Sequence, residues 1–158
     1  MTIAPRLAQS NALDYLAEAV TFLLKDHEAR YPRLVAQGKI TPDEAEHGLN
    51  LMRAIDAQWR WVMDPAHPPA PAYDDDSGEF GFLNFHLAAK MAKMAEKTRA
   101  IATSKPGDFR AQEMADLCEG LAWFQQDVAG SARIVMYMAS VRKMRAKVAQ
   151  IAGKAEAA

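Results

Sequence analysis

Apolar side chains in the first third of the chain recur at steps of three and four residues, the spacing of one face of an α-helix. Ser10 or Asn11 can cap this helix, because a short polar side chain accepts from the free N–H groups of the first turn. Pro32 should kink or end the helix, and Gly38 suits the left-handed position that stops it. The apolar run contains Leu13, Leu16, Val20, Leu23, Leu24, His27, Tyr31 and Leu34.

A second helix has the clearest start signal in the chain. Thr41 is a cap, Pro42 stands at the first helical position, and Glu44 follows at the third. Residues 12–63 therefore predict a helical hairpin, whose short turn favours antiparallel packing. Its second apolar run contains Ala45, Leu49, Met52, Ile55, Trp59 and Val62.

The composition changes at residue 64, where four prolines precede the acidic run Asp74-Asp75-Asp76. Such a segment is stiff and extended. We therefore divide the chain into an N-terminal helical hairpin (1–63), an acidic proline-rich linker (64–79) and a helical C-terminal region (80–158). One packed domain overall remains compatible with this division.

The C-terminal region predicts further helices and no strand. The third helix should begin near Asp76 or Ser77, and Asp108 should cap the last segment, 109–151. That segment carries two apolar stripes rotated from each other, so we favour a break near Gly130 over one long helix. The expected fold is all-α and bundle-like, with four to five helices. The second stripe contains Ile134, Tyr137, Val141, Met144, Val148 and Ile151.

The net charge of −1 hides an uneven distribution. Residues 1–79 carry 7 Lys and Arg against 13 Asp and Glu, whereas residues 80–158 carry 12 against 7. The two halves could neutralise each other, or the basic half could face an anionic partner. The single Cys118 allows no internal disulfide, and no signal peptide or membrane-length apolar run is visible, which favours a cytoplasmic protein with no membrane contact.

No motif in the sequence indicates catalysis. Glu44 and His47 have the Glu-x-x-His spacing of di-iron bundles, but such a site needs a second copy of the motif, which the sequence lacks. Cys118 has no CxxC companion, and neither a nucleophile elbow nor a glycine-rich phosphate loop occurs. We therefore expect a protein that is not an enzyme and that uses no cofactor or metal.

Two basic clusters suggest a binding function. His86, Lys90, Lys93 and Lys97 recur at steps of four, three and four, which places them on one helix face. The second cluster is Arg142, Lys143, Arg145 and Lys147. Clustered basic side chains can bind a phosphate backbone, although a solvated helix face explains the same pattern. The candidate binding residues are Lys90, Lys93, Lys97, Arg142 and Arg145.

The hairpin resembles a group of small helical proteins common in phage and prophage genomes. The resemblance covers residues 27–59 and rests on the pattern Tyr31-Pro32-x-x-Val35-x-x-Gly38-x-x-Thr41, followed by a Met-x-Ala-Ile helix. Leu34 stands where that group has Trp. The resemblance implies a phage-related origin and carries no activity. Near the turn, Tyr31, Arg33 and Trp59 form a second candidate binding surface.

These observations lead to two functional hypotheses. The first is a non-enzymatic accessory protein of phage type that binds nucleic acid through its basic helix faces. The alternative is a protein–protein adaptor or assembly factor that uses its apolar stripes and forms a helical homo-oligomer. The rotated second stripe predicts a homodimer in either case.

Overall fold

The computed structural model describes residue 5 and residues 12–158. It confirms the all-α fold, with five helices and one very small antiparallel sheet in the part described. The helices are α2 (Leu13–Ala36), α3 (Pro42–Met63), α4 (Asn84–Ser104), α5 (Phe109–Gln125) and α6 (Arg133–Ala157), and the strands are β1 (Asp127–Val128) and β2 (Ser131–Ala132).

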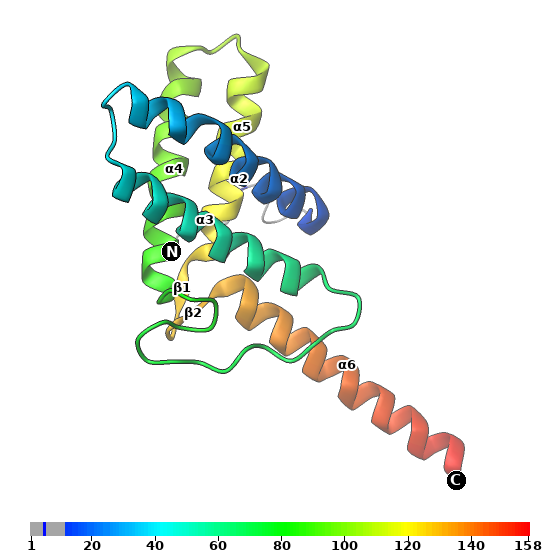
Figure 1. Ribbon diagram of the computed structural model, residues 1–158. Coiled ribbons are helices and arrows are strands. Elements are labelled where there is room, and N and C mark those ends of the chain that lie inside the picture. The colour runs from blue at the N-terminus through cyan, green and yellow to red at the C-terminus, as the bar shows by residue number, and fades with distance from the viewer. Residues whose placement is uncertain (1–4, 6–11) are drawn as a thin grey trace.

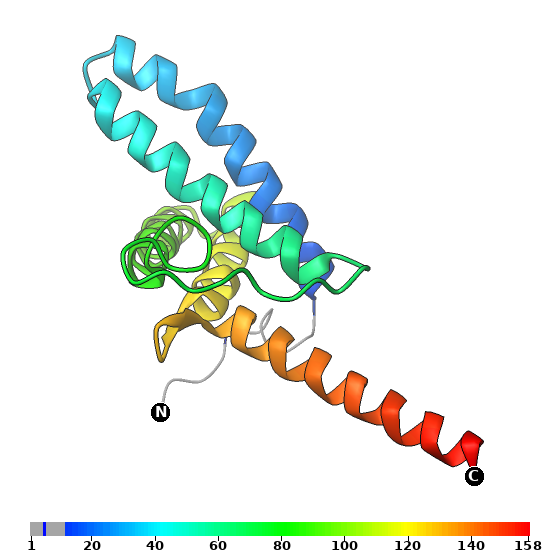
Figure 2. The same ribbon diagram turned by 60° about the horizontal axis from the view of Figure 1, so that its bottom comes forward.

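Two helical hairpins make up the body of the molecule. The α2–α3 hairpin lies across the α4–α5 hairpin, and α6 starts beneath them and extends away from the body (Figures 1 and 2). One hydrophobic cluster contains buried side chains from all five helices, so both halves of the chain share a core. Representative members are Leu16, Trp59, Leu87, Leu121 and Ile134.

The turn between α2 and α3 confirms the sequence signals. Gly38 has φ +67°, and the Thr41 hydroxyl accepts from the Glu44 N–H at 3.1 Å while the Glu44 carboxylate accepts from the Thr41 N–H at 2.7 Å. Pro32 does not end α2, which continues to Ala36. The residue at the N-cap of α2 is Ala12; the predicted caps Ser10 and Asn11 lie outside the described residues.

Helix α4 begins at Asn84, so the predicted start near Asp76 or Ser77 was wrong. The Asp74 carboxylate accepts from the N–H groups of Asp76 and Ser77, both at 2.9 Å, which closes a turn instead of a helix. Gly78 then has φ +63°, a conformation that a right-handed helix cannot contain.

The segment 64–79 is irregular, as its prolines predict, and it is fastened to α3. The Trp61 indole N–H lies 3.1 Å from the Pro68 carbonyl oxygen and 3.2 Å from that of Pro69. The ring of Phe80 packs edge-on against Trp61 at a centroid distance of 6.3 Å. The segment therefore runs along the body as part of the fold (Figure 2).

The predicted break near Gly130 is confirmed, and its form corrects the expectation of no strand. Between α5 and α6 the chain makes a tight antiparallel hairpin that pairs Asp127 with Ala132. Ala129 and Gly130 both have positive φ, +53° and +90°, as two-residue hairpin turns require. This hairpin turns the chain between α5 and α6, which explains why the two apolar stripes are rotated.

A buried amide network joins three helices. The Gln125 side chain is fully buried, and its Nε2 donates to Gln58 Oε1 at 2.7 Å and to Asn84 Oδ1 at 2.9 Å. These residues come from α5, α3 and α4. Because an unpaired amide in a core is costly, this network favours one arrangement of the helices.

Candidate binding surface

The three hairpin candidates do not form one surface. Trp59 is 2% exposed and packs edge-on against Phe124 in the core, 18 residues beyond Thr41. At a rise of 1.5 Å per residue that is roughly 27 Å from the turn. Arg33 is exposed and Tyr31 is half-buried. The proposed cluster around Trp59 is therefore corrected: this residue belongs to the core.

Tyr31 instead connects α2 to α3 and α4. Its hydroxyl accepts from the Lys90 ammonium at 2.9 Å, and its ring lies 4.8 Å from the imidazole of His27. The ring also lies against Gly48, where an added Cβ would sit 2.8 Å from a ring carbon. Gly48 thus permits the close approach of Tyr31, and Lys90 is held by the body.

The basic face of α4 is only partly available to a partner. Lys93 and Lys97 are exposed, as is His86, whereas Lys90 is half-buried and bonded to Tyr31. Two exposed lysines on one helix face can add salt-dependent attraction to an anion, but they are fewer than the four positions that the sequence suggested.

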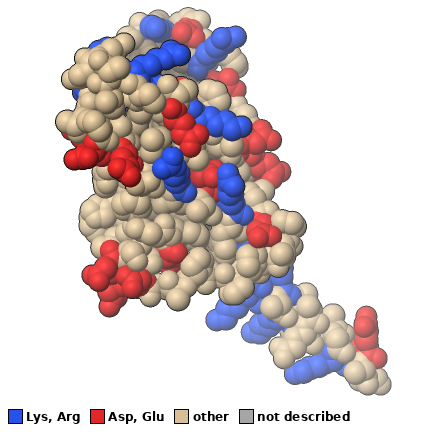
Figure 3. All heavy atoms as spheres, viewed as in Figure 1, with Lys and Arg blue, Asp and Glu red and all other residues tan. Residues whose placement is uncertain are grey.

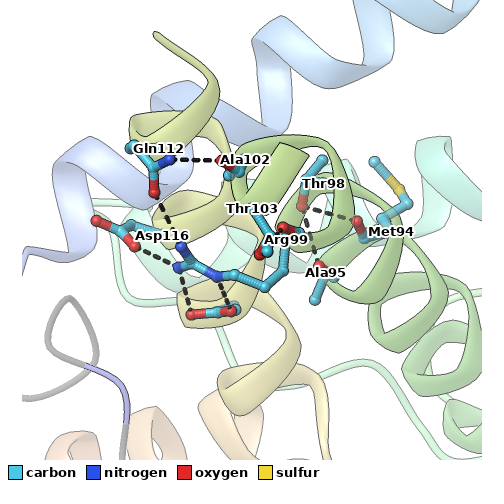
Figure 4. A network of polar contacts seen from close by, with 9 residues as sticks. Met94, Ala95, Thr98, Arg99, Ala102, Thr103, Gln112 and Asp116 are labelled. Carbon is cyan, nitrogen blue, oxygen red and sulfur yellow. Dashed lines mark hydrogen bonds and ion pairs between the residues drawn. The ribbon is translucent and has the colours of Figure 1, made fainter. Parts of the chain in front are cut away.

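Another positive charge of α4 is compensated within the body. Arg99 donates from Nε to Glu119 at 2.6 Å and from a terminal nitrogen to Asp116 at 2.5 Å (Figure 4). Arg99 also donates to the side-chain oxygen of Gln112, whose amide nitrogen in turn donates to the Ala102 carbonyl at 2.7 Å. The two carboxylates raise the pKa of Arg99, the larger effect coming from Glu119. This network holds α4 against α5 and pairs the charge of Arg99 within the body.

Arg142 is also part of the fold. Its guanidinium carbon lies 4.1 Å from the centroid of the Trp61 ring, and its terminal nitrogens donate to the carbonyls of Pro68 at 2.8 Å and Trp61 at 2.7 Å. The Trp61 carbonyl belongs to the last turn of α3, where carbonyls lack helical partners and attract cations. Arg142 therefore fixes α6 to α3 and to the 64–79 segment, which corrects its assignment as a free binding residue.

Replacing Arg142 by Met should lower the free energy of unfolding by about 2–3 kcal/mol, because part-buried charge-assisted bonds to two backbone carbonyls are lost. Arg142→Lys should retain only part of this stabilisation, since an ammonium group cannot stack flat on Trp61 and donate to two carbonyls at once. Urea denaturation measures both values. Lys143→Met, at an exposed neighbour, is the control, and an equal loss in this variant would contradict the assignment.

Beyond Arg142, helix α6 has no contact that buries a side chain. Every residue from Lys143 to Ala158 is exposed. Only the end of the second apolar stripe lies on this projecting part: Met144 is 62% exposed, and Val148 and Ile151 are each 60% exposed, whereas Ile134 at the start of the stripe is fully buried in the core. Val141, Met144, Arg145, Val148 and Ala149 line a shallow hollow on the helix surface. No other described residue covers Met144, Val148 or Ile151.

Basic side chains surround this stripe. In the space-filling view, Lys and Arg gather on α6, whereas they alternate with Asp and Glu over the body (Figure 3). The basic residues of the projecting part are Lys143, Arg145, Lys147 and Lys154, and its one acidic residue is Glu156. Arg145, unlike Arg142, is exposed as the sequence suggested. The projecting helix thus combines an apolar stripe with positive flanks.

Among residue 5 and residues 12–158, no group of three or more His, Cys, Asp or Glu side chains could hold a metal ion. Cys118 is fully buried, and this burial raises the pKa of its thiol, which disfavours the reactive thiolate.

None of the helices in the described residues has the length and apolar character needed to cross a membrane. Comparison of the chain with protein-family models, with curated proteins and with solved structures gives no match. The described residues therefore form an all-α protein in which the end of α6 exposes both apolar and basic side chains.

Proposed function

We propose that this protein is a non-enzymatic accessory protein that acts as an adaptor or assembly factor and binds a protein partner through the projecting part of α6. The supporting observation is the apolar stripe of Met144, Val148 and Ile151, which is exposed along one side of a helix that leaves the body. Exposed contiguous apolar surface rimmed by polar residues is typical of interaction sites.

The isolated position of this helix adds to the proposal. About 15 helical residues without tertiary contacts are only marginally stable in water. A partner that covers the stripe would stabilise them, so binding and helix stability would be linked. The resemblance of residues 27–59 to phage proteins fits an accessory role of phage type.

Nucleic-acid binding is the second candidate. It is favoured by the exposed Lys93 and Lys97 on α4 and Arg145 on α6. It is disfavoured by the internal bonds of Lys90 and Arg142, which remove two of the five basic residues expected to contact phosphates. It also leaves the apolar stripe without a role.

Site-specific photo-crosslinking tests the two candidates in cells that make the protein. A diazirine amino acid at Val148 should give protein adducts, because this position lies in the stripe. The same probe at Ala146, on the opposite side of the helix, is the matched control and should give far fewer. Nucleic-acid adducts at positions 97 and 148 would instead favour the second candidate. Equal labelling by the probes at positions 146 and 148 would contradict the adaptor proposal.

A further inference from the structure

We propose that the partner of α6 is an acidic amphipathic helix, which pairs with Val141, Met144, Val148 and Ile151 as in a short coiled coil. This inference rests on the proposed adaptor function and names the chemistry of the partner. Two observations support it, namely the spacing of the apolar residues and the charges of the residues beside them.

The spacing of the stripe fits another helix. Val141 and Val148 are seven residues apart, and so are Met144 and Ile151, which places them at positions a and d of a heptad. A stripe confined to a and d is the narrow seam of a coiled coil, whereas a helix that lies on a membrane or a broad core buries a wider face. The seam, which is half-buried at Val141 and exposed from Met144 to Ile151, therefore matches the spacing of one facing helix.

The flanking charges select an acidic partner. With the seam at a and d, Arg145 occupies position e, and Lys147 and Lys154 occupy position g. Residues at e and g face the partner helix and set partner choice through interhelical ion pairs. A partner with Glu or Asp at these positions would neutralise all three cations, and its binding would weaken with salt.

A second copy of α6 lacks this complementarity. No acidic residue occurs in α6 before Glu156. Two copies paired along this stripe would therefore offer only basic or neutral side chains at e and g, in either orientation. Like charges beside a seam oppose pairing, so the homodimer expected from the sequence becomes the competing occupant of the same surface.

Binding of synthetic helices to the full-length protein tests the inference. The probe is a labelled three-heptad peptide with Ile at a, Leu at d and Glu at e and g, and the matched control peptide has Lys at e and g. Fluorescence anisotropy at about 0.1 M salt should show at least about tenfold tighter binding of the Glu peptide. Raising the salt should reduce this preference.

Two variants separate the contribution of the apolar seam to peptide binding from that of the charged residues beside it. Met144→Glu/Val148→Glu should abolish peptide binding without loss of the body's fold, because both side chains are exposed; Ala146→Glu on the opposite side is its control. Arg145→Glu/Lys147→Glu/Lys154→Glu should reverse the preference toward the Lys peptide. Circular dichroism confirms folding of each variant.

The acidic-helix inference would be overturned by equal binding of the two peptides, by no binding of either, or by a sedimentation velocity profile that shows a dimer lost in Met144→Glu/Val148→Glu. Tighter binding of a DNA duplex than of the Glu peptide in the same assay would overturn it as well. Protein adducts at position 148 combined with failure of the peptide would leave the adaptor function standing and reject only the acidic helix.

Discussion

Trp59→Ala is expected to lower the free energy of unfolding by about 3–5 kcal/mol, the range for truncating a buried aromatic side chain. Trp59 is 2% exposed, and its ring packs edge-on against Phe124 at a centroid distance of 5.9 Å. The substitution removes the packing of Trp59 on Phe124 between α3 and α5 and leaves a cavity. Since a whole domain is stable by only about 5–15 kcal/mol, a large share of its stability would be lost.

Urea denaturation followed by circular dichroism measures this loss. Phe109→Ala is the control, because Phe109 is 76% exposed and its truncation should change stability by less than about 0.5 kcal/mol. A comparable effect of the two substitutions would mean that Trp59 lies on the surface, where the sequence alone had placed it as a binding residue.

The second expected result is a folding stability that falls as the pH drops from about 6.5 to about 4, through His27. Burial lowers the pKa of this imidazole from 6.5 to about 4, with the positive charge of Lys90 as the next cause. In this window the unfolded chain binds a proton that the folded chain does not. The stabilisation is therefore complete above pH 6.5 and is lost as the pH approaches 4, by on the order of 3 kcal/mol.

His27→Gln isolates this contribution. Carboxylates also titrate below pH 5, but they do so in both proteins, so the difference between the two stability profiles belongs to His27. Urea denaturation at pH 7.5 and pH 5 should show a steeper loss for the wild-type protein than for the variant. Parallel profiles would show that the imidazole is accessible to solvent in the folded protein.

Local signals in the sequence determined most of the helix boundaries. Thr41 and Glu44 form the predicted capping box, Gly38 has the predicted left-handed conformation, and the Asp108 carboxylate accepts from the Ala111 N–H at 3.2 Å. These features depend on residues within four positions of each other. The sequence is therefore sufficient to predict them.

The start of α4 depended on more distant contacts and was missed. The third helix was expected to begin near Asp76 or Ser77, yet the Asp74 side chain closes a turn there, and the chain has no helix up to Leu83. Phe80 and Phe82 in this stretch pack against the core. Phe80 packs on Trp61 and Phe82 on His47, both of which lie in α3, and no local pattern describes these contacts.

The sequence by itself determined an all-α chain with capped helices, a break near Gly130 and a basic, apolar-striped final helix. Only the tertiary structure decided which of these residues remain free to bind. Lys90 and Arg142 carry the same charge as Lys97 and Arg145, but a tyrosine hydroxyl and backbone carbonyls from distant segments hold the first pair. Helix periodicity gives the side of a helix on which a residue lies, whereas the packing of other helices determines whether that side is covered.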